Sequence, residues 1–247
     1  MTPALPRRER AAMLAGLALL CALAWGYTWR VSDDHMAWCS VNNAPWRAAD
    51  LAASFAMWAV MMAAMMVPSV SPIVLAFAGV SRARRKKAMP YVPAAVFLAG
   101  YLAAWAAFSA AATAAQEALR SAALLSPDMA ANSRWIGRAL LIAAGIFQWT
   151  PLKNACLRHC RSPLGFLLTE WRDGPAGALQ MGWRHGLYCV GCCWLLMALL
   201  FVVGIMNLVW VAAIAGFVIL EKLVPRGAAV GRAAGVVLAV WGLWGVR

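Results

Sequence analysis

Long apolar runs separated by short polar segments dominate this chain. Seven runs are long enough to form helices, at about 11–29, 51–79, 91–115, 135–152, 187–204, 207–223 and 228–245. An α-helix rises 1.5 Å per residue, so about 20 apolar residues cross the roughly 30 Å hydrocarbon core of a bilayer. The pattern predicts an all-α fold: a polytopic transmembrane helical bundle of about seven spans.

The second run is longer than one straight crossing needs, and it contains Pro68 and Pro72 in "MVPSVSP". Proline removes a backbone donor and kinks or ends a helix. We therefore expect a bent or broken helix here. Irregular backbone at membrane depth persists only where protein or a water-filled cavity supports it, which makes this region a candidate functional site.

The first run resembles a signal peptide, because basic residues precede it. No convincing small-x-small cleavage site comes before the polar segment that follows, so we expect a retained first helix. The chain is predicted to form a single integral membrane domain over 1–247, with an interfacial inner loop at 153–184.

Composition agrees with this interpretation: 64% of the residues are hydrophobic and 13% are charged, whereas about a quarter are charged in soluble domains. A net charge of +13 would suggest a nucleic-acid partner in a soluble protein. Here the basic residues lie between apolar runs, so they indicate topology and a lipid-bilayer partner, and we expect no nucleic acid.

Sixteen of the 22 lysines and arginines lie in the segments 7–10, 82–87, 153–184 and 222–232. In the predicted topology these segments share one side of the membrane, and the other six basic residues lie on the opposite side. Cytoplasmic loops carry an excess of lysine and arginine. The pattern predicts the N-terminus inside, the C-terminus outside and a multi-pass protein of the bacterial inner membrane.

Five methionines in "MWAVMMAAMMVPS" form the first group of candidate ligands. Met57, Met61 and Met65 repeat every four residues, and Met62 and Met66 form a second row beside them, so one helix face carries all five. Thioethers are soft donors that select Cu(I). Methionine also fills gaps between packed helices, which is the alternative interpretation.

A second group lies on the predicted inner side, in "TPLKNACLRHCRSP". Cys156, His159 and Cys160 share one helix face, and Pro163 should end that helix. Neighbouring basic side chains favour the thiolate form of these cysteines, which is the form that binds metals and attacks as a nucleophile. A pair of reduced cytosolic cysteines without a role is the alternative.

The third group is "YCVGCCW". In a helix, Cys189 and Cys193 lie one turn apart with Cys192 beside both, and Met197 continues the face one turn deeper. A free cysteine can also be simply a small buried hydrophobe. Cys189 and Cys192 are formally a C-x-x-C pair, the spacing used in disulfide exchange.

Arranged by predicted depth, the soft donors recur along most of the membrane normal. They run from the inner cysteines to the methionines and then to an outer loop, "SDDHMAWCS", with His35, Met36 and Cys39. Glu221 lies beside Lys222 at the inner end of the run at 207–223. It either balances a buried charge or forms an ordinary ion pair.

The segments "MWAVMMAAMMVPS", "TPLKNACLRHCRSPLGFL" and "GWRHGLYCVGCCWLLMALLFVVGIMNLVW" followed by "LEK" are together specific. In these segments the chain resembles a bacterial family of predicted metal-binding integral membrane proteins. The resemblance implies metal binding, and the role suspected for that family is copper delivery to a tyrosinase-type enzyme.

The leading hypothesis is a membrane protein that binds Cu(I) and passes it, by ligand exchange and without enzymatic chemistry, to a copper-dependent enzyme or a copper chaperone. The chain has no P-loop, so an ATP-driven pump is a poor fit, and three histidines are few for zinc. One alternative is a membrane thiol-disulfide oxidoreductase using Cys189 and Cys192. Another is an assembly factor in which the cysteines only pack.

Overall fold

The computed structural model describes residues 5–38, 47–85, 92–126, 130 and 132–244, with only the backbone described at 33–38 and 85. The elements are helices: α1 (Arg7–Trp38), α2 (Ala48–Arg85), α3 (Ala94–Ser121), α4 (Arg134–Phe147), α5 (Pro151–Arg161), α6 (Pro163–Glu170), α7 (Gly174–Ala198), α8 (Leu200–Val203), α9 (Leu208–Leu223) and α10 (Gly227–Trp244). No β-strand occurs in the described part of the chain. The all-α prediction is confirmed.

Five helical segments are long and apolar enough to cross a bilayer: 7–32, 48–84, 94–121, 174–203 and 227–244. The predicted count of about seven spans is not confirmed. The apolar runs at 135–152 and 207–223 form α4 and α9, of 14 and 16 residues. Helices of these lengths rise only about 21 and 24 Å, less than the hydrocarbon thickness.

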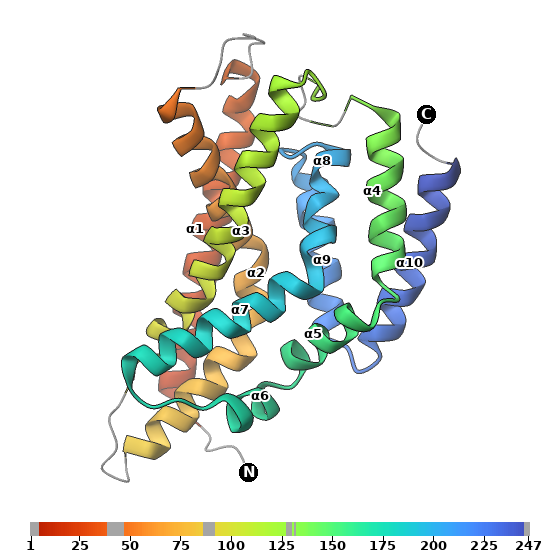
Figure 1. The fold of residues 1–247 in the computed structure, drawn as a ribbon. Helices are drawn as coiled ribbons and strands as arrows, with labels where there is room; N and C mark the ends of the chain where they lie inside the picture. Colours follow the sequence, from red (N-terminus) through yellow and green to blue (C-terminus); the bar gives the residue numbers. More distant parts are fainter. Residues whose placement is uncertain (1–4, 39–46, 86–91, 127–129, 131, 245–247) are drawn as a thin grey trace.

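The segment 153–184, expected as an interfacial inner loop with a helix at 156–160, is mostly helical. It holds most of α5, all of α6 and the first part of α7, and each of these three helices has a proline in its first turn. Proline fits the first turn because the backbone donor that it lacks would have no partner there. In Figure 1, α7 runs obliquely across the lower part of the bundle before it turns upward toward α8.

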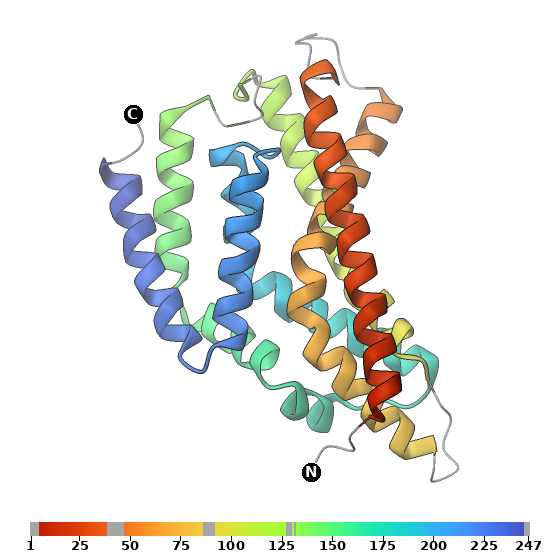
Figure 2. The same cartoon turned by 180° about the vertical axis from the view of Figure 1, so that it is seen from behind.

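The second helix is continuous through Pro68 and Pro72, so of the two expected forms, bent or broken, it is not the broken one. The predicted bend is present, because the two halves of α2 run in different directions in Figure 2. A proline leaves the carbonyl four residues earlier without its helical donor. The Ala64 carbonyl accepts from the Cys21 thiol at 3.6 Å, and the Pro68 carbonyl accepts from the Ser71 hydroxyl at 2.9 Å.

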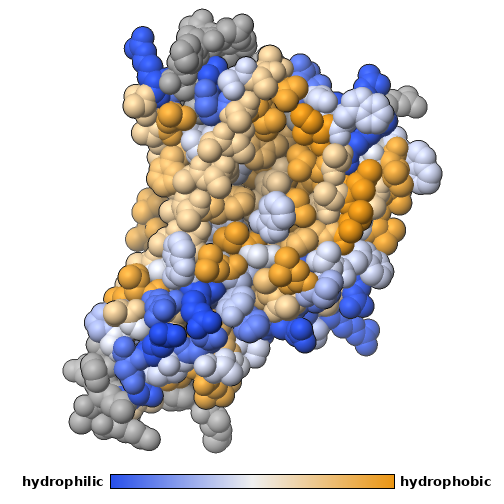
Figure 3. Space-filling view, viewed as in Figure 1, coloured by the Kyte–Doolittle hydropathy of each residue, from blue (hydrophilic) through white to orange (hydrophobic). Residues whose placement is uncertain are grey.

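Apolar side chains cover the middle of the face seen in Figure 3, with hydrophilic side chains gathered toward its two ends. Large apolar residues also lie exposed on several helices, including Leu23 on α1, Val209 on α9 and Val237 on α10. Contiguous apolar surface of this kind is costly in water and marks contact with a membrane or another protein.

Glycines allow α3 and α7 to pack with their backbones in contact. A Cβ at Gly182 of α7 would overlap the Phe97 carbonyl of α3, and one at Gly100 of α3 would overlap the Leu179 carbonyl of α7. Small residues at helix crossings are the usual basis of close packing in membranes. This crossing holds the α3 and α7 side chains of the site described below at a fixed separation.

We predict that Gly182→Ala destabilises the protein by on the order of 1–3 kcal/mol, because the added methyl must push α3 and α7 apart. The matched control is Gly216→Ala in α9, where a Cβ meets nothing within 4 Å. Thermal unfolding in detergent measures both variants. Equal unfolding temperatures for the two would contradict this account of the crossing.

Candidate functional site

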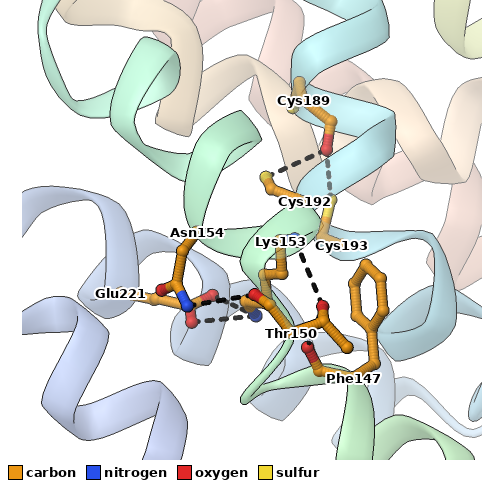
Figure 4. A network of polar contacts seen from close by, with 8 residues as sticks. All are labelled: Phe147, Thr150, Lys153, Asn154, Cys189, Cys192, Cys193 and Glu221. Atoms are coloured by element: carbon orange, nitrogen blue, oxygen red, sulfur yellow. Dashed lines mark hydrogen bonds and ion pairs between the residues drawn. The ribbon is translucent and has the colours of Figure 1, made fainter.

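Three thiols occupy one turn of α7, buried inside the bundle. Cys189 is 1% exposed, and Cys192 and Cys193 are fully buried. The Cys192 and Cys193 thiols donate to the Cys189 carbonyl at 3.1 and 2.9 Å, as Figure 4 shows. The spacing in "YCVGCCW" therefore does place the three sulfurs together, as helical geometry predicts.

The Cys189 sulfur is the point at which four helices meet. Lys222 Nζ of α9 donates to it at 2.9 Å, and the Tyr101 hydroxyl of α3 lies 3.0 Å from it. Lys222 also donates to the Ser69 hydroxyl of α2 at 3.1 Å. A buried ammonium beside a sulfur compensates the negative charge of a thiolate, the form of cysteine that binds metals.

The predicted inner pair joins this cluster from α5. Hydrogen bonds to Cys189 and Cys192 raise the pKa of the Cys160 thiol well above its usual range, and burial raises it further. Cys156 lies against α7 where Gly191 provides room, since a Cβ there would be 2.8 Å from its sulfur. Burial, and then the proximity of Cys192, raise the pKa of Cys156, so the expectation that neighbouring basic residues favour the thiolate at this pair is wrong.

Two histidines flank the thiols. The His159 ring stacks on Tyr188 with centroids 4.2 Å apart, and its Nδ1 lies 2.9 Å from the Ala155 carbonyl. A carbonyl only accepts, so Nδ1 carries the proton and Nε2 of the neutral ring keeps its lone pair. His185, one turn before Cys189 on α7, is 3% exposed, and its Nδ1 has no partner among the described residues.

All five methionines of the predicted stripe are buried in the core, and Met197 is also buried. The Met66 end lies near the thiols, because the Met66 carbonyl accepts from the Ser69 hydroxyl at 2.9 Å and from the Tyr101 hydroxyl at 3.5 Å. Next to Met57 at the other end, Trp58 Nε1 donates to Gln116 of α3 at 2.7 Å. The stripe therefore extends from the thiols toward the last turns of α3.

The predicted outer loop differs from the structure. Residues 33–38 continue α1, so His35 and Met36 lie on a helix and not in a loop, although their side chains are outside the described part. Helical hydrogen bonding extends past the end of the apolar run at 29. Cys39 lies outside the described residues.

A second buried charge pair lies close to the thiols. Lys153 Nζ of α5 is 2.8 Å from the Glu221 carboxylate of α9, and each side chain is 1% exposed (Figure 4). Of the two roles considered for Glu221, the structure contains the ion pair. The pair neutralises itself, so Lys222, the next residue along α9, is free to contact Cys189.

The site does not form a preassembled polydentate metal centre. Within the described residues, no group of three or more His, Cys, Asp and Glu side chains has an arrangement that could hold a metal ion. The four-ligand tetrahedral site that structural zinc requires is therefore not formed by those side chains. Sites with two ligands, or with methionine as a ligand, are compatible with this finding.

Tyr101, Ser69 and His185 were not identified from the sequence as parts of the site. Each is a polar side chain inside a long apolar helix, which is a signal of function in membrane proteins. Tyr101 lies alone among apolar residues, so spacing gave no reason to select it. His185 lies one helical turn before Cys189 and Ser69 one turn after Met66, and this spacing could have selected both.

A model of the PpoB2 family, described as copper chaperone, matches residues 55–245. The chain belongs to the PpoB2 copper chaperone family. This membership confirms the resemblance found in the sequence, and the description is that of a chaperone and not of an enzyme. No curated protein and no solved structure matches the chain significantly.

The matched segment of this copper chaperone family member contains all twelve candidate ligands: Met57, Met61, Met62, Met65, Met66, Cys156, His159, Cys160, Cys189, Cys192, Cys193 and Met197. It also contains Tyr101 and Lys222, which contact the Cys189 sulfur, and Ser69, which accepts from Lys222. His35, Met36 and Cys39 precede it. The family match thus covers the inner thiols and the stripe, but not the outer group.

We predict that Lys153→Met destabilises the protein by about 3–5 kcal/mol, because it leaves the Glu221 carboxylate buried without its cation. The double variant Lys153→Met/Glu221→Gln should recover most of this loss. Thermal unfolding in detergent tests both, with Glu221→Gln alone completing the cycle. Strictly additive effects would show that the pair does not interact.

Proposed function

We propose that this protein binds Cu(I) at the thiols around Cys189 and delivers the metal to a copper-dependent enzyme. The observation that carries the proposal is the Cys189 sulfur itself, buried where α2, α3, α7 and α9 meet, with an ammonium at 2.9 Å. Membership in a copper chaperone family supports the choice of metal. Thiolate is a soft ligand and suits Cu(I).

Cys189 and Cys160 are the primary ligands in this proposal, because their thiols come from two helices and are hydrogen-bonded to one another. Cys192, Cys193 and Cys156 lie close enough to take over one coordination position at a time. His159 contributes Nε2 at the edge of the cluster. Cu(I) tolerates low coordination numbers, so it can move among these donors by ligand exchange.

The methionine stripe provides the route away from the thiols. Met66 lies beside Tyr101, which contacts Cys189, and Met57 lies near the opposite end of the buried face of α2. Met65, Met62 and Met61 fill the interval as thioether donors, with Met197 on α7 as a further one. Thioethers bind Cu(I) more weakly than thiolates, which permits onward transfer.

We further propose a multi-pass protein of the bacterial inner membrane, formed as one domain, with the N-terminus inside and the C-terminus outside. The first turn of α1 and the last turn of α10 lie at opposite ends of the structure in Figure 1, which supports an odd number of crossings. The lysine and arginine bias supports the orientation. The short helices α4 and α9 would complete seven crossings in a locally thinned bilayer.

The two alternatives find less support. A redox C-x-x-C needs an accessible thiol for its partner, whereas Cys189 and Cys192 lie in mid-helix and are buried, and the six described cysteines are free. A cysteine that only packs needs no ammonium against its sulfur, whereas Cys189 has Lys222 there.

We predict that the purified protein retains Cu(I) under reducing conditions and that Cys189→Ser/Cys192→Ser/Cys193→Ser loses most of it. Serine keeps the shape but replaces a soft donor by a hard one. Metal analysis by mass spectrometry measures the retention. The control is Cys21→Ser in α1. The Cys21 thiol donates to the Ala64 carbonyl, and both residues are distant in sequence from the three cysteines that are replaced. Full copper retention by the triple variant would disprove the assignment.

We predict that Met57→Leu/Met61→Leu/Met65→Leu keeps Cu(I) bound at the thiols but slows its transfer by about tenfold or more, because the thioethers are lost while the apolar packing remains. Release from loaded proteoliposomes to a Cu(I) chelator measures transfer. Met13→Leu in α1 controls for loss of a thioether outside the stripe. Unchanged transfer would mean that the stripe only packs.

A further inference from the structure

The charges of the buried side chains near the thiols do not sum to zero, because one ammonium has no carboxylate partner among the described residues. Lys153 and Glu221 neutralise each other. Lys222 is 6% exposed, and its ammonium donates hydrogen bonds to the Cys189 sulfur and the Ser69 hydroxyl. In the part of the chain that the structure describes, no carboxylate lies within 4.0 Å of its ammonium.

A lone charge in a low-dielectric interior is costly, and the cost is removed only by an opposite charge close by. The group nearest to the Lys222 ammonium that can carry a negative charge is the Cys189 sulfur, at 2.9 Å. The Ser69 hydroxyl can accept a hydrogen bond but carries no charge. The site thus holds one fixed positive charge whose counter-charge must come from the thiolates or from whatever they bind.

This fixed charge discriminates between metals. A monovalent metal held by two thiolates has a net charge of −1, which the ammonium balances. A divalent metal held by the same two thiolates is neutral, so with the ammonium the buried site keeps an uncompensated charge of +1. The count of two thiolates follows from the proposed function, in which Cys189 and Cys160, hydrogen-bonded across α7 and α5, are the primary ligands.

We propose that Lys222 is the specificity-determining residue of the copper site. Its ammonium makes the complex of one monovalent soft metal with two thiolates, Cys189 and Cys160, electrically neutral in the protein interior. It acts without contacting the metal, through the sulfur that it touches. This inference rests on the proposed function, in which Cys189 is a ligand.

The experiment uses the full chain, purified in detergent under anaerobic, reducing conditions, and measures Cu(I) and Zn(II) affinities by competition with chromogenic chelators. Lys222→Met removes the charge at similar side-chain length and should weaken Cu(I) binding by on the order of 100-fold or more. It should leave Zn(II) binding unchanged or tighter. Lys222→Arg keeps the charge and should rescue most of the Cu(I) preference.

Ser69→Ala is the matched control, because it removes the other hydrogen-bond acceptor of Lys222 but leaves the charge in place. It should change the ratio of Cu(I) to Zn(II) affinity far less than Lys222→Met does, with a shift at least about tenfold smaller. An equal loss in Ser69→Ala and Lys222→Met would assign the effect to hydrogen bonding and overturn the electrostatic role.

A second measurement on the wild type keeps the proposal testable if Lys222→Met fails to fold. X-ray absorption of the Cu(I)-loaded protein should find two sulfur neighbours, and Ag(I), also monovalent and soft, should compete with Cu(I). Three neighbours at thiolate distances would leave an excess negative charge beside Lys222 and overturn the inference, whereas a third sulfur from a neutral thioether would not change the charge. Failure of the wild type to bind Cu(I) would instead disprove the proposed function. Binding with an unchanged metal preference in Lys222→Met would disprove only the role of Lys222.

Discussion

The contact between the Lys222 ammonium and the Cys189 sulfur is the constraint on which the rest of the centre depends. An ammonium that is buried among apolar helices needs acceptors within hydrogen-bond distance, and here these come from α7 and α2. Tyr101 of α3 completes the surroundings of the sulfur. Since four helices provide these groups, their relative positions must be held within a few tenths of an ångström for the contacts to persist.

That accuracy comes from helix packing with little side-chain volume between the backbones. Gly100 and Gly182 bring α3 and α7 together on the side of Tyr101, and Gly191 lets Cys156 of α5 lie against α7. The bend of α2 at its two prolines lies within the same region as Ser69. Close packing of this kind restricts the relative movement of the helices, so the apolar framework keeps the charged groups at the distances that their contacts require.

Two successive residues of α9 divide the electrostatic roles between them. Glu221 pairs with Lys153 of α5, while Lys222 contacts the thiols of α7. Adjacent helix positions point about 100° apart, so one helix can serve two separate partners. The arrangement joins the short helices α5 and α9 to the longer α7 and thereby brings Cys160 to Cys189.

The sequence by itself determined the helical class, the apolar character and the grouping of ligands along single helices, because these follow from local periodicity and composition. It placed Cys189, Cys192 and Cys193 on one turn and the five methionines on one face. It did not show that α4 and α9 are too short by themselves to cross a bilayer, or that helices extend through most of 153–184 beyond the one expected at 156–160. Only the tertiary structure decided that Cys160 meets Cys189, that Lys222 and Tyr101 contact the Cys189 sulfur and that Ser69 accepts from Lys222. Contacts between helices depend on crossing geometry that no local pattern encodes.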